Sequence, residues 1–419
     1  MLKPFRNITY RLLRRSEQYT QTDMVYLAKG NFWQVLGQVI TSVFSLALVI
    51  VFANYLPKET YGLYRYILSI AGILSVFTLT GMNQAVSQAV AVGNEGALRE
   101  SIKYQLKWNL MQFFALVILG AYYFLNDNLQ LALSLWIMSV FSPLTAAFGT
   151  YGAYLAGKRQ FRLTNIFSII STAVYVAGMI TVIFLSGEIV WLIAAYSLTT
   201  LGAALYFYFT TLRKFGPPAG DARNVLKYGR ELTFIGFLGP IMSQIDKIIL
   251  THFWGATQLA VYSLATAVPD KAVSFIKGWV HIGMPKFSAK KPKEINTVFK
   301  IRIFQGLIVG AICTLAYIVL SPYLFEYLIP KYIDSLLYSQ LLSVSFIFAM
   351  PNRYIGLLMA SQKLSRLIFT NSMVQGVIRI ASYIILGIWG GVLGLVIAQI
   401  LNSLIAMIIN IIMWRSVRN

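Results

Sequence analysis

Several ionisable side chains lie within segments that are otherwise apolar enough to cross a lipid bilayer. In the stretch MSQIDKIIL (242–250), an acid and a base are adjacent at Asp246 and Lys247. A charged group at the centre of a membrane helix costs about 3 kcal/mol or more, so it usually faces a partner or a water-filled cavity. We therefore treat each such residue as a candidate for substrate binding, gating or ion coupling. The other members of this set are Asp270, Lys271, Lys277, Arg353 and Arg379.

One of these segments carries a polar stripe. Asp270, Ser274, Lys277 and His281 follow one another at i, i+4, i+7 and i+11, which places them on one face of a helix. Cationic groups on such a face suit an anionic phosphate group. Asp246 and Asp270 are predicted to act in gating or ion coupling. The predicted charged substrate contacts are Lys271, Lys277, His281, Arg353 and Arg379.

A purely structural role is the alternative for these charged residues. Asp246 and Lys271 fall at similar predicted depths, so they could form an ion pair that holds two helices together. Arg353 could extend to the membrane surface, and His281 could be an interfacial residue. Adjacent residues point about 100° apart on a helix, so Asp246 and Lys247 cannot both face one partner. We expect Asp246 to face inward and Lys247 to extend toward the outer interface.

Neutral polar side chains provide a second group of predicted substrate contacts. Gln34 and Gln38 lie in the first apolar segment, and Gln84 and Gln88 lie in the second. Their amides could bind sugar hydroxyls, although glutamines in membrane helices also hold helices together. The sequence contains no acidic metal-binding cluster, nucleophile arrangement or glycine-rich phosphate loop. We therefore predict no catalytic residue, metal or cofactor, and no enzymatic activity.

The composition is that of a multi-pass membrane protein. Of the 419 residues, 58% are hydrophobic and only 12% are charged, and runs of roughly 20 apolar residues, the length needed to cross a bilayer, recur along the chain. The predicted fold is all-α with twelve transmembrane helices. We place them at 31–55, 62–90, 105–125, 129–156, 164–186, 189–212, 231–254, 258–285, 301–321, 336–361, 367–388 and 391–414.

The distribution of basic residues predicts the orientation. Most of the 35 Lys and Arg residues fall in loops on one side, whereas the opposite side has only Lys58, Arg65 and Lys331. Basic loops face the cytoplasm, so both termini are predicted to be cytoplasmic. The net charge of +21 is spread over these short loops and not over a soluble face, which argues against nucleic-acid binding. Residues 1–30 form a basic segment without the features of a cleaved signal peptide.

The two halves of the chain resemble each other. FANYLPKETYGLYRY (52–66) occupies the same place after the first span as THFWGATQLAVYSLA (251–265) does after the seventh, and AGKRQFR (156–162) corresponds to ASQKLSR (360–366). Such a repeat predicts two six-helix lobes, 31–212 and 231–419, related by a pseudo-two-fold axis along the membrane normal. The basic loop 213–230, which contains GPPAG, is the predicted linker.

These motifs resemble those of bacterial polysaccharide flippases. The similarity rests on LPKETYGLY (56–64), LAGKRQFRLTN (155–165), IDKIIL (245–250) followed by LAVYSLA (259–265), and MPKFS (284–288). The family consists of O-antigen and teichoic-acid type exporters of the multidrug/oligosaccharidyl-lipid/polysaccharide superfamily. The resemblance implies transport of an undecaprenyl-pyrophosphate-linked oligosaccharide to the outer leaflet of the bacterial inner membrane. The expected partners are this lipid-linked substrate, membrane lipids and the polysaccharide polymerase machinery, and we expect a monomer.

Two other functions compete with this one. A cation-coupled multidrug antiporter of the same superfamily would need acids in its cavity, and spans one to six contain none. A membrane polymerase or glycosyltransferase of the same pathway would need an acidic cluster or a sizeable outer loop. Coupling to protons, to sodium or to the membrane potential is compatible with the sequence, and several sugar structures are as well.

Overall fold

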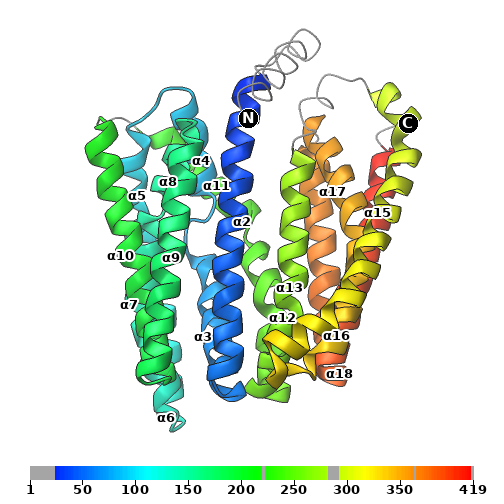
Figure 1. Cartoon of the computed structure of the whole chain (residues 1–419). Coiled ribbons are helices and arrows are strands. Elements are labelled where there is room, and N and C mark those ends of the chain that lie inside the picture. Colours follow the sequence, from blue (N-terminus) through cyan, green and yellow to red (C-terminus); the bar gives the residue numbers. More distant parts are fainter. Residues whose placement is uncertain (1–23, 219–221, 282–291, 363–364, 417–419) are drawn as a thin grey trace, which may run out of the picture.

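The computed structural model describes residues 24–218, 222–281, 292–362 and 365–416, and this part of the chain is helical apart from short connections (Figure 1). The helices of the first half are α2 (Met24–Tyr55), α3 (Lys58–Leu74), α4 (Met82–Ala91), α5 (Ala97–Trp108), α6 (Leu110–Leu125), α7 (Leu129–Phe148), α8 (Tyr151–Gly157), α9 (Phe161–Leu185) and α10 (Ile189–Phe215). Those of the second half are α11 (Arg223–Ile235), α12 (Leu238–Trp254), α13 (Ala256–His281), α15 (Pro292–Leu328), α16 (Ser335–Ser343), α17 (Ser345–Ser361) and α18 (Ser365–Ser416).

Ten helical segments among the described residues are long and apolar enough to cross a membrane. The predicted multi-pass, all-α architecture is therefore confirmed. The longest segment, Leu367–Arg415, has 49 residues and is interrupted at Gly391, whose φ of 54° and ψ of −133° are not helical. A Cβ atom at this position would lie 3.0 Å from the Trp254 ring, so the break needs glycine both for its backbone and for its space.

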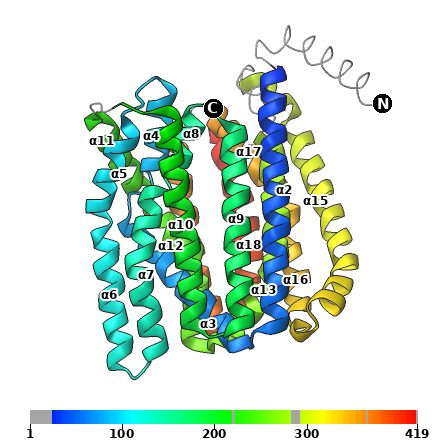
Figure 2. The same ribbon diagram turned by 60° about the vertical axis from the view of Figure 1, so that its left-hand side comes forward.

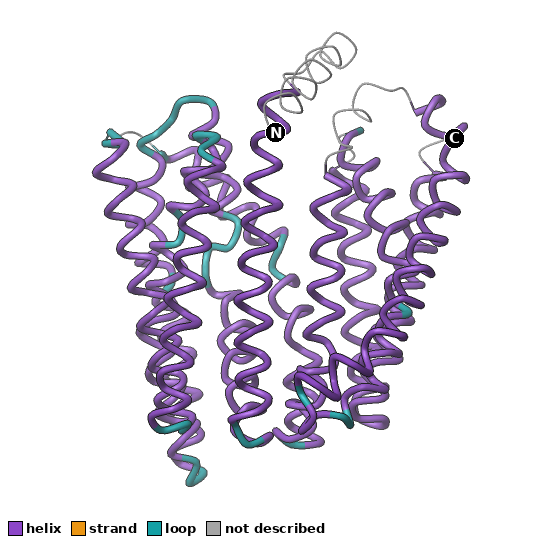
Figure 3. Tube along the Cα trace, in the orientation of Figure 1, coloured by secondary structure: helices purple, strands orange, loops and turns teal. Residues whose placement is uncertain are grey.

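Two of the predicted spans are interrupted near the middle of the bundle. The predicted span 62–90 consists of α3, a short 3₁₀ turn (Ser75–Phe77) and α4, with Thr78 in an extended conformation between them. The predicted span 231–254 consists of α11 and α12, which separate at residues 236–237. These interruptions meet, because the Gly81 N–H donates to Thr233 Oγ1 at 3.0 Å. Figure 3 shows short loop segments at mid-height as well as the connections at the two ends.

The helices pack mainly within each half of the chain. In the first half α2 packs on α9, α9 on α10, α10 on α7 and α7 on α6, and in the second half α12 packs on α18, α18 on α17, α17 on α15 and α15 on α16. Figure 2 shows α6 and α15 on opposite flanks of the bundle. The halves meet where α3 packs on α12 and α13, and α11 packs on α4. Residues 223–230 of the predicted linker are thus helical and lie against the first half.

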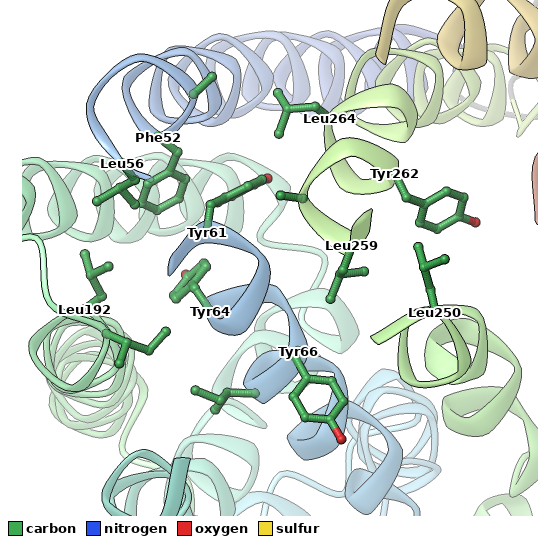
Figure 4. Packing of buried hydrophobic residues seen from close by; sticks show 14 of the residues in the cluster. Phe52, Leu56, Tyr61, Tyr64, Tyr66, Leu192, Leu250, Leu259, Tyr262 and Leu264 are labelled. Atoms are coloured by element: carbon green, nitrogen blue, oxygen red, sulfur yellow. The ribbon is translucent and has the colours of Figure 1, made fainter. Parts of the chain in front are cut away.

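A buried aromatic cluster fills the contact between the halves. Tyr61 and Tyr64 on α3 pack against Phe52 on α2, with ring centroids 5.4 and 5.3 Å from the Phe52 ring. The Tyr64 hydroxyl is hydrogen-bonded to that of Tyr175 at 3.1 Å, so its polar atom is satisfied inside the core. Figure 4 shows this cluster reaching Leu259 and Tyr262 in the second half. The buried hydrophobic core is therefore continuous across the two halves.

Glu95 ties two connections of the first half together. It lies between α4 and α5, forms a salt bridge with Lys158 after α8, and accepts a hydrogen bond of 2.7 Å from the Tyr154 hydroxyl. The Lys158 and Tyr154 hydrogen bonds hold the pKa of the Glu95 carboxyl below its usual value. This contribution to stability is therefore complete above the ordinary carboxyl pKa and is lost as the pH falls through the lowered pKa.

We expect Glu95→Gln to destabilise the protein by about 1 kcal/mol at pH 7, a modest effect because the salt bridge is partly exposed to solvent. Thermal unfolding in detergent should show the difference at pH 7 and a smaller one at acidic pH. Glu100→Gln is the matched control, since Glu100 pairs only with the exposed Lys103 three residues away. Equal effects of the two substitutions would show that Glu95 has no special role.

Candidate substrate-binding site

A polar cavity of about 470 Å³ lies within the second half of the chain. Its lining comes from α12, α13, α17 and α18, and it contains three ionisable groups, Asp270, Arg353 and Arg379. The remaining polar lining is a set of carboxamides and hydroxyls: Ser345, Asn352, Ser372, Gln375, Gln399, Asn402, Ser403 and Asn410. Two predicted substrate contacts and one predicted gating acid are thus brought to the same cavity.

The two arginines of the cavity have most of their hydrogen-bond donors available. Arg379 donates from Nε to the Tyr383 hydroxyl at 3.2 Å, and its guanidinium carbon lies 5.3 Å from the centre of the Tyr383 ring. Arg353 is exposed to the cavity. Among the described residues, neither arginine forms an ion pair with a carboxylate. Each guanidinium carries five N–H donors, so the pair can bind an anion with several oxygen atoms.

A network of carboxamides runs along the wall of this cavity. Asn410 donates to Asn352 Oδ1 at 2.8 Å and accepts from Asn371 at 2.6 Å, and Gln375 donates to Asn371 Oδ1 at 2.7 Å. Asn352 in turn donates to the backbone oxygen of Ser403. These bonds join α17 to both arms of α18. This network was not predicted, although carboxamides inside three apolar segments are a signal for it.

Asp246 is buried at the edge of the same region, and its partner differs from the predicted one. Its Oδ2 accepts a hydrogen bond of 2.8 Å from the Tyr262 hydroxyl, which also lies 3.3 Å from Gln399 Oε1 on the cavity wall. The predicted ion pair with Lys271 is wrong. Because α13 begins at Ala256, Tyr262 lies at the depth of Asp246, whereas Lys271 is nine residues farther on, about 14 Å along the helix. Oδ1 of Asp246 is buried and has no hydrogen-bond partner in the described part of the chain.

Contrary to the prediction, Lys247 does not extend toward the end of α12. Its Nζ donates to Gln244 Oε1 at 2.7 Å, three residues back toward the start of α12. The side chain is half-buried where α12 packs on α3, and it interacts electrostatically with Asp246, Asp270 and Arg65. Lys247 therefore belongs to a charged cluster between the two halves.

Contrary to the prediction, Arg65 lies inside a helix and not in a loop. It was counted with the loop between the first two spans, but α3 already begins at Lys58, so Arg65 lies two turns inside a membrane-crossing helix. Its Nε is buried without a partner among the described residues, and the side chain interacts electrostatically with Asp270. All the charged candidates named from the sequence lie in the second half, so this buried cation of the first half was not predicted. The first half contributes a cation to the contact between the halves.

The other predicted contacts are less closely grouped. Lys271 is half-buried and interacts electrostatically with Asp270 and Arg65. The glutamines Gln34 and Gln38 on α2, and Gln84 and Gln88 on α4, are exposed and do not line the cavity of Arg353 and Arg379. Lys277 and His281 belong to α13, but their side chains lie outside the described residues. No group of three potential metal ligands occurs in the part of the chain that the structure describes.

Comparison with known proteins identifies the family. Residues 27–278 match the family described as "Polysaccharide biosynthesis protein". The chain belongs to this family. A putative O-antigen transporter of Shigella flexneri is 21% identical over 272 residues, which cover 58% of this chain and 62% of that relative. The resemblance to polysaccharide flippases found in the sequence is thereby confirmed.

Solved structures of the superfamily share the fold of this polysaccharide biosynthesis protein. The lipid II flippase MurJ in an inward closed conformation superposes with a TM-score of 0.69 at 15% identity, covering 92% of this chain and 87% of MurJ. An outward-facing multidrug resistance MATE family transporter of the MOP superfamily superposes with a TM-score of 0.66 at 14% identity, covering 93% of this chain and 95% of that one. Flippases and drug transporters thus share this fold, and the side chains of the cavity have to distinguish them.

Proposed function

We propose that the protein flips an undecaprenyl-pyrophosphate-linked oligosaccharide from the cytoplasmic to the outer leaflet of the bacterial inner membrane by alternating access. The observation that carries this proposal is the cavity with Arg353 and Arg379, two guanidiniums that form no ion pair with a carboxylate among the described residues, although Arg379 interacts electrostatically with Asp246. An unpaired cation within a membrane segment is unfavourable, and an anionic pyrophosphate would relieve that cost by charge-assisted hydrogen bonds. The carboxamides around them suit the hydroxyls of the attached sugars.

We propose that the chain has twelve spans in two six-helix lobes, with both termini in the cytoplasm. The 26-residue helix α13 and the division of α18 at Gly391 support this number beyond the ten segments described above. Both ends of the described chain lie at the same end of the bundle, which suits an even number of spans (Figure 1). Residues 213–230 would then link the lobes on the cytoplasmic side.

The remaining predicted contacts have places in this scheme. Arg65 and Lys271, which approach Asp270 from the two halves, would contact the headgroup as it passes between the lobes. Lys277 and His281 would extend the cationic face along α13. The glutamines at 34, 38, 84 and 88 would meet the sugars on the first-lobe side. The protein would act as a monomer and deliver its product to the polysaccharide polymerase machinery.

Asp246 is the proposed coupling acid. It is buried, and its hydrogen bond to Tyr262 links it to Gln399 on the cavity wall. A change in its protonation would therefore alter the hydrogen bonds at the substrate site. We expect Asp246→Asn to fold normally but to lose any acceleration of flipping by a transmembrane proton gradient, because the amide cannot exchange the proton. Flipping should be measured in proteoliposomes with and without the gradient. A variant that responds to the gradient like the wild type would exclude Asp246 as the coupling group.

The antiporter alternative fits the fold but not the charges of the cavity. A site for cationic drugs needs an excess of acids, whereas this cavity has two arginines and one aspartate. Depletion of the protein in its source bacterium separates the two functions. We expect lipid-linked oligosaccharide to accumulate and surface polysaccharide to be lost, with unchanged sensitivity to cationic drugs. Increased drug sensitivity with normal surface polysaccharide would contradict the proposal.

A further inference from the structure

At the end of the bundle opposite the termini, two turns from different halves of the chain contact each other (Figure 1). One turn, 54–58, joins α2 to α3, and the other segment, 328–334, joins α15 to α16. Asn54 Nδ2 donates to the backbone oxygen of Leu328 at 2.7 Å, and Lys331 Nζ donates to the backbone oxygen of Asn54. Lys58 Nζ lies 3.0 Å from Asp334 Oδ2. Three polar bonds thus connect the halves at this end.

Aromatic packing lies directly behind these bonds. The rings of Tyr61 and Tyr332 meet edge to face with centroids 6.4 Å apart, and Lys58 Nζ lies 5.2 Å from the centre of the Tyr332 ring. The backbone of Gly62 touches that of Ala256 so closely that a Cβ atom at Gly62 would lie 1.8 Å from the Ala256 oxygen. The two halves are therefore closed against each other at this end.

Two features distinguish this closure from permanent packing. The side chains of Lys58 and Asp334 are 31% and 66% exposed, and ion pairs in such positions contribute little net stability. The Tyr332 hydroxyl is buried without a hydrogen-bond partner in the described part of the chain. An unsatisfied buried hydroxyl is unfavourable, and it would regain water if the halves separated. The exposed ion pair thus adds little to the packing behind it, and the buried Tyr332 hydroxyl favours opening.

We propose that Asn54, Lys58, Leu328, Lys331 and Asp334 form a releasable latch that closes the end opposite the termini and must open in each transport cycle. This inference rests on the proposed flippase function, because an alternating-access transporter has to open each end in turn. In the conformation described here the latch is closed. A substrate in the membrane interior could not leave at this end until the latch opens.

Cross-linking tests the latch. In a Cys313→Ser background, which removes the only cysteine, Lys58→Cys and Asp334→Cys are joined by a short, reducible bifunctional thiol reagent after reconstitution into proteoliposomes. We expect cross-linking to slow flipping by about tenfold or more and reduction to restore it, since opening would be blocked. A matched control joins Glu100→Cys to Lys103→Cys, an ion pair of 2.8 Å within α5. That cross-link should leave the rate unchanged.

If the protein cross-linked between positions 58 and 334 flips its substrate as fast as the protein without the cross-link, the latch proposal is wrong. A protein that flips no lipid-linked oligosaccharide even before cross-linking would instead count against the proposed function. In that case spin labels on the same two cysteines still test the latch. We expect a short and a long distance between the labels, whose proportions change with pH or added lipid-linked oligosaccharide. A single short distance under all these conditions would contradict the inference.

Discussion

Replacing Arg379 with glutamine is expected to slow flipping about 10- to 100-fold without unfolding the protein. A hydrogen bond to a charged group contributes about 1.5–3 kcal/mol, and each 1.4 kcal/mol corresponds to a factor of about ten. The guanidinium lines the cavity, and only its Nε has a partner among the described residues, so its other donors are available to a phosphate. The flipping rate of Arg379→Lys should lie between those of the wild type and Arg379→Gln, because lysine keeps the charge but lacks the planar pair of donors. Single-turnover flipping in proteoliposomes measures the effect.

Arg302→Gln provides the control for charge removal. Arg302 is exposed on α15, and its hydrogen bond in the described part of the chain goes to Gln305, so its replacement should leave the flipping rate unchanged. Thermal unfolding should be similar for both variants. If Arg379→Gln flips lipid-linked oligosaccharide at the wild-type rate, the cationic cavity does not bind the headgroup.

Arg65→Gln is expected to slow flipping by a similar factor, about 10- to 100-fold. The side chain is the cation that the first half contributes to the contact between the halves, and its Nε has no hydrogen-bond partner among the described residues. A substrate headgroup that moves between the halves would supply the missing acceptor. The measurement is again single-turnover flipping, normalised to the amount of folded protein.

A double variant, Arg65→Gln with Asp270→Asn, separates a role of Arg65 in substrate binding from one in structural pairing. If Arg65 only balances the charge of Asp270, then Arg65→Gln combined with Asp270→Asn should restore flipping, since neither charge would remain unbalanced. If Arg65 binds the headgroup, the double variant should regain thermal stability but flip more slowly than Asp270→Asn alone. Recovery of the wild-type rate would contradict the role of Arg65 in substrate binding.

The sequence predicted the elements that depend on long apolar runs. The run 31–55 lies within α2, and the predicted start of 129–156 coincides with that of α7, because such runs can only be buried in lipid or against other helices. The interruptions at Thr78 and at residues 236–237 could not be predicted. They meet where the Gly81 N–H donates to Thr233 Oγ1, and these two residues are 152 positions apart in the chain. Apolar composition does not report such contacts.

The site was predicted by residue type but not by position. Arg353 and Arg379 were found because charges inside apolar segments are conspicuous, and they do share a cavity. Arg65 was assigned wrongly because the start of a helix determines the depth of each residue along it, and α3 begins at Lys58, four residues earlier than predicted. α13 begins at Ala256, two residues earlier than predicted, and places Tyr262 rather than Lys271 beside Asp246. An error of one turn moves a side chain by about 5 Å.

Reconstituted flipping with two matched lipids tests the central claim most directly. Proteoliposomes containing the purified protein would receive the same oligosaccharide on undecaprenyl pyrophosphate or on an uncharged undecaprenyl ether, and transfer between leaflets would be measured for each. The cationic cavity predicts rapid transfer of the pyrophosphate lipid only, with that preference lost in Arg379→Gln. Equal transfer of both lipids by the wild-type protein, or transfer of neither, would contradict it.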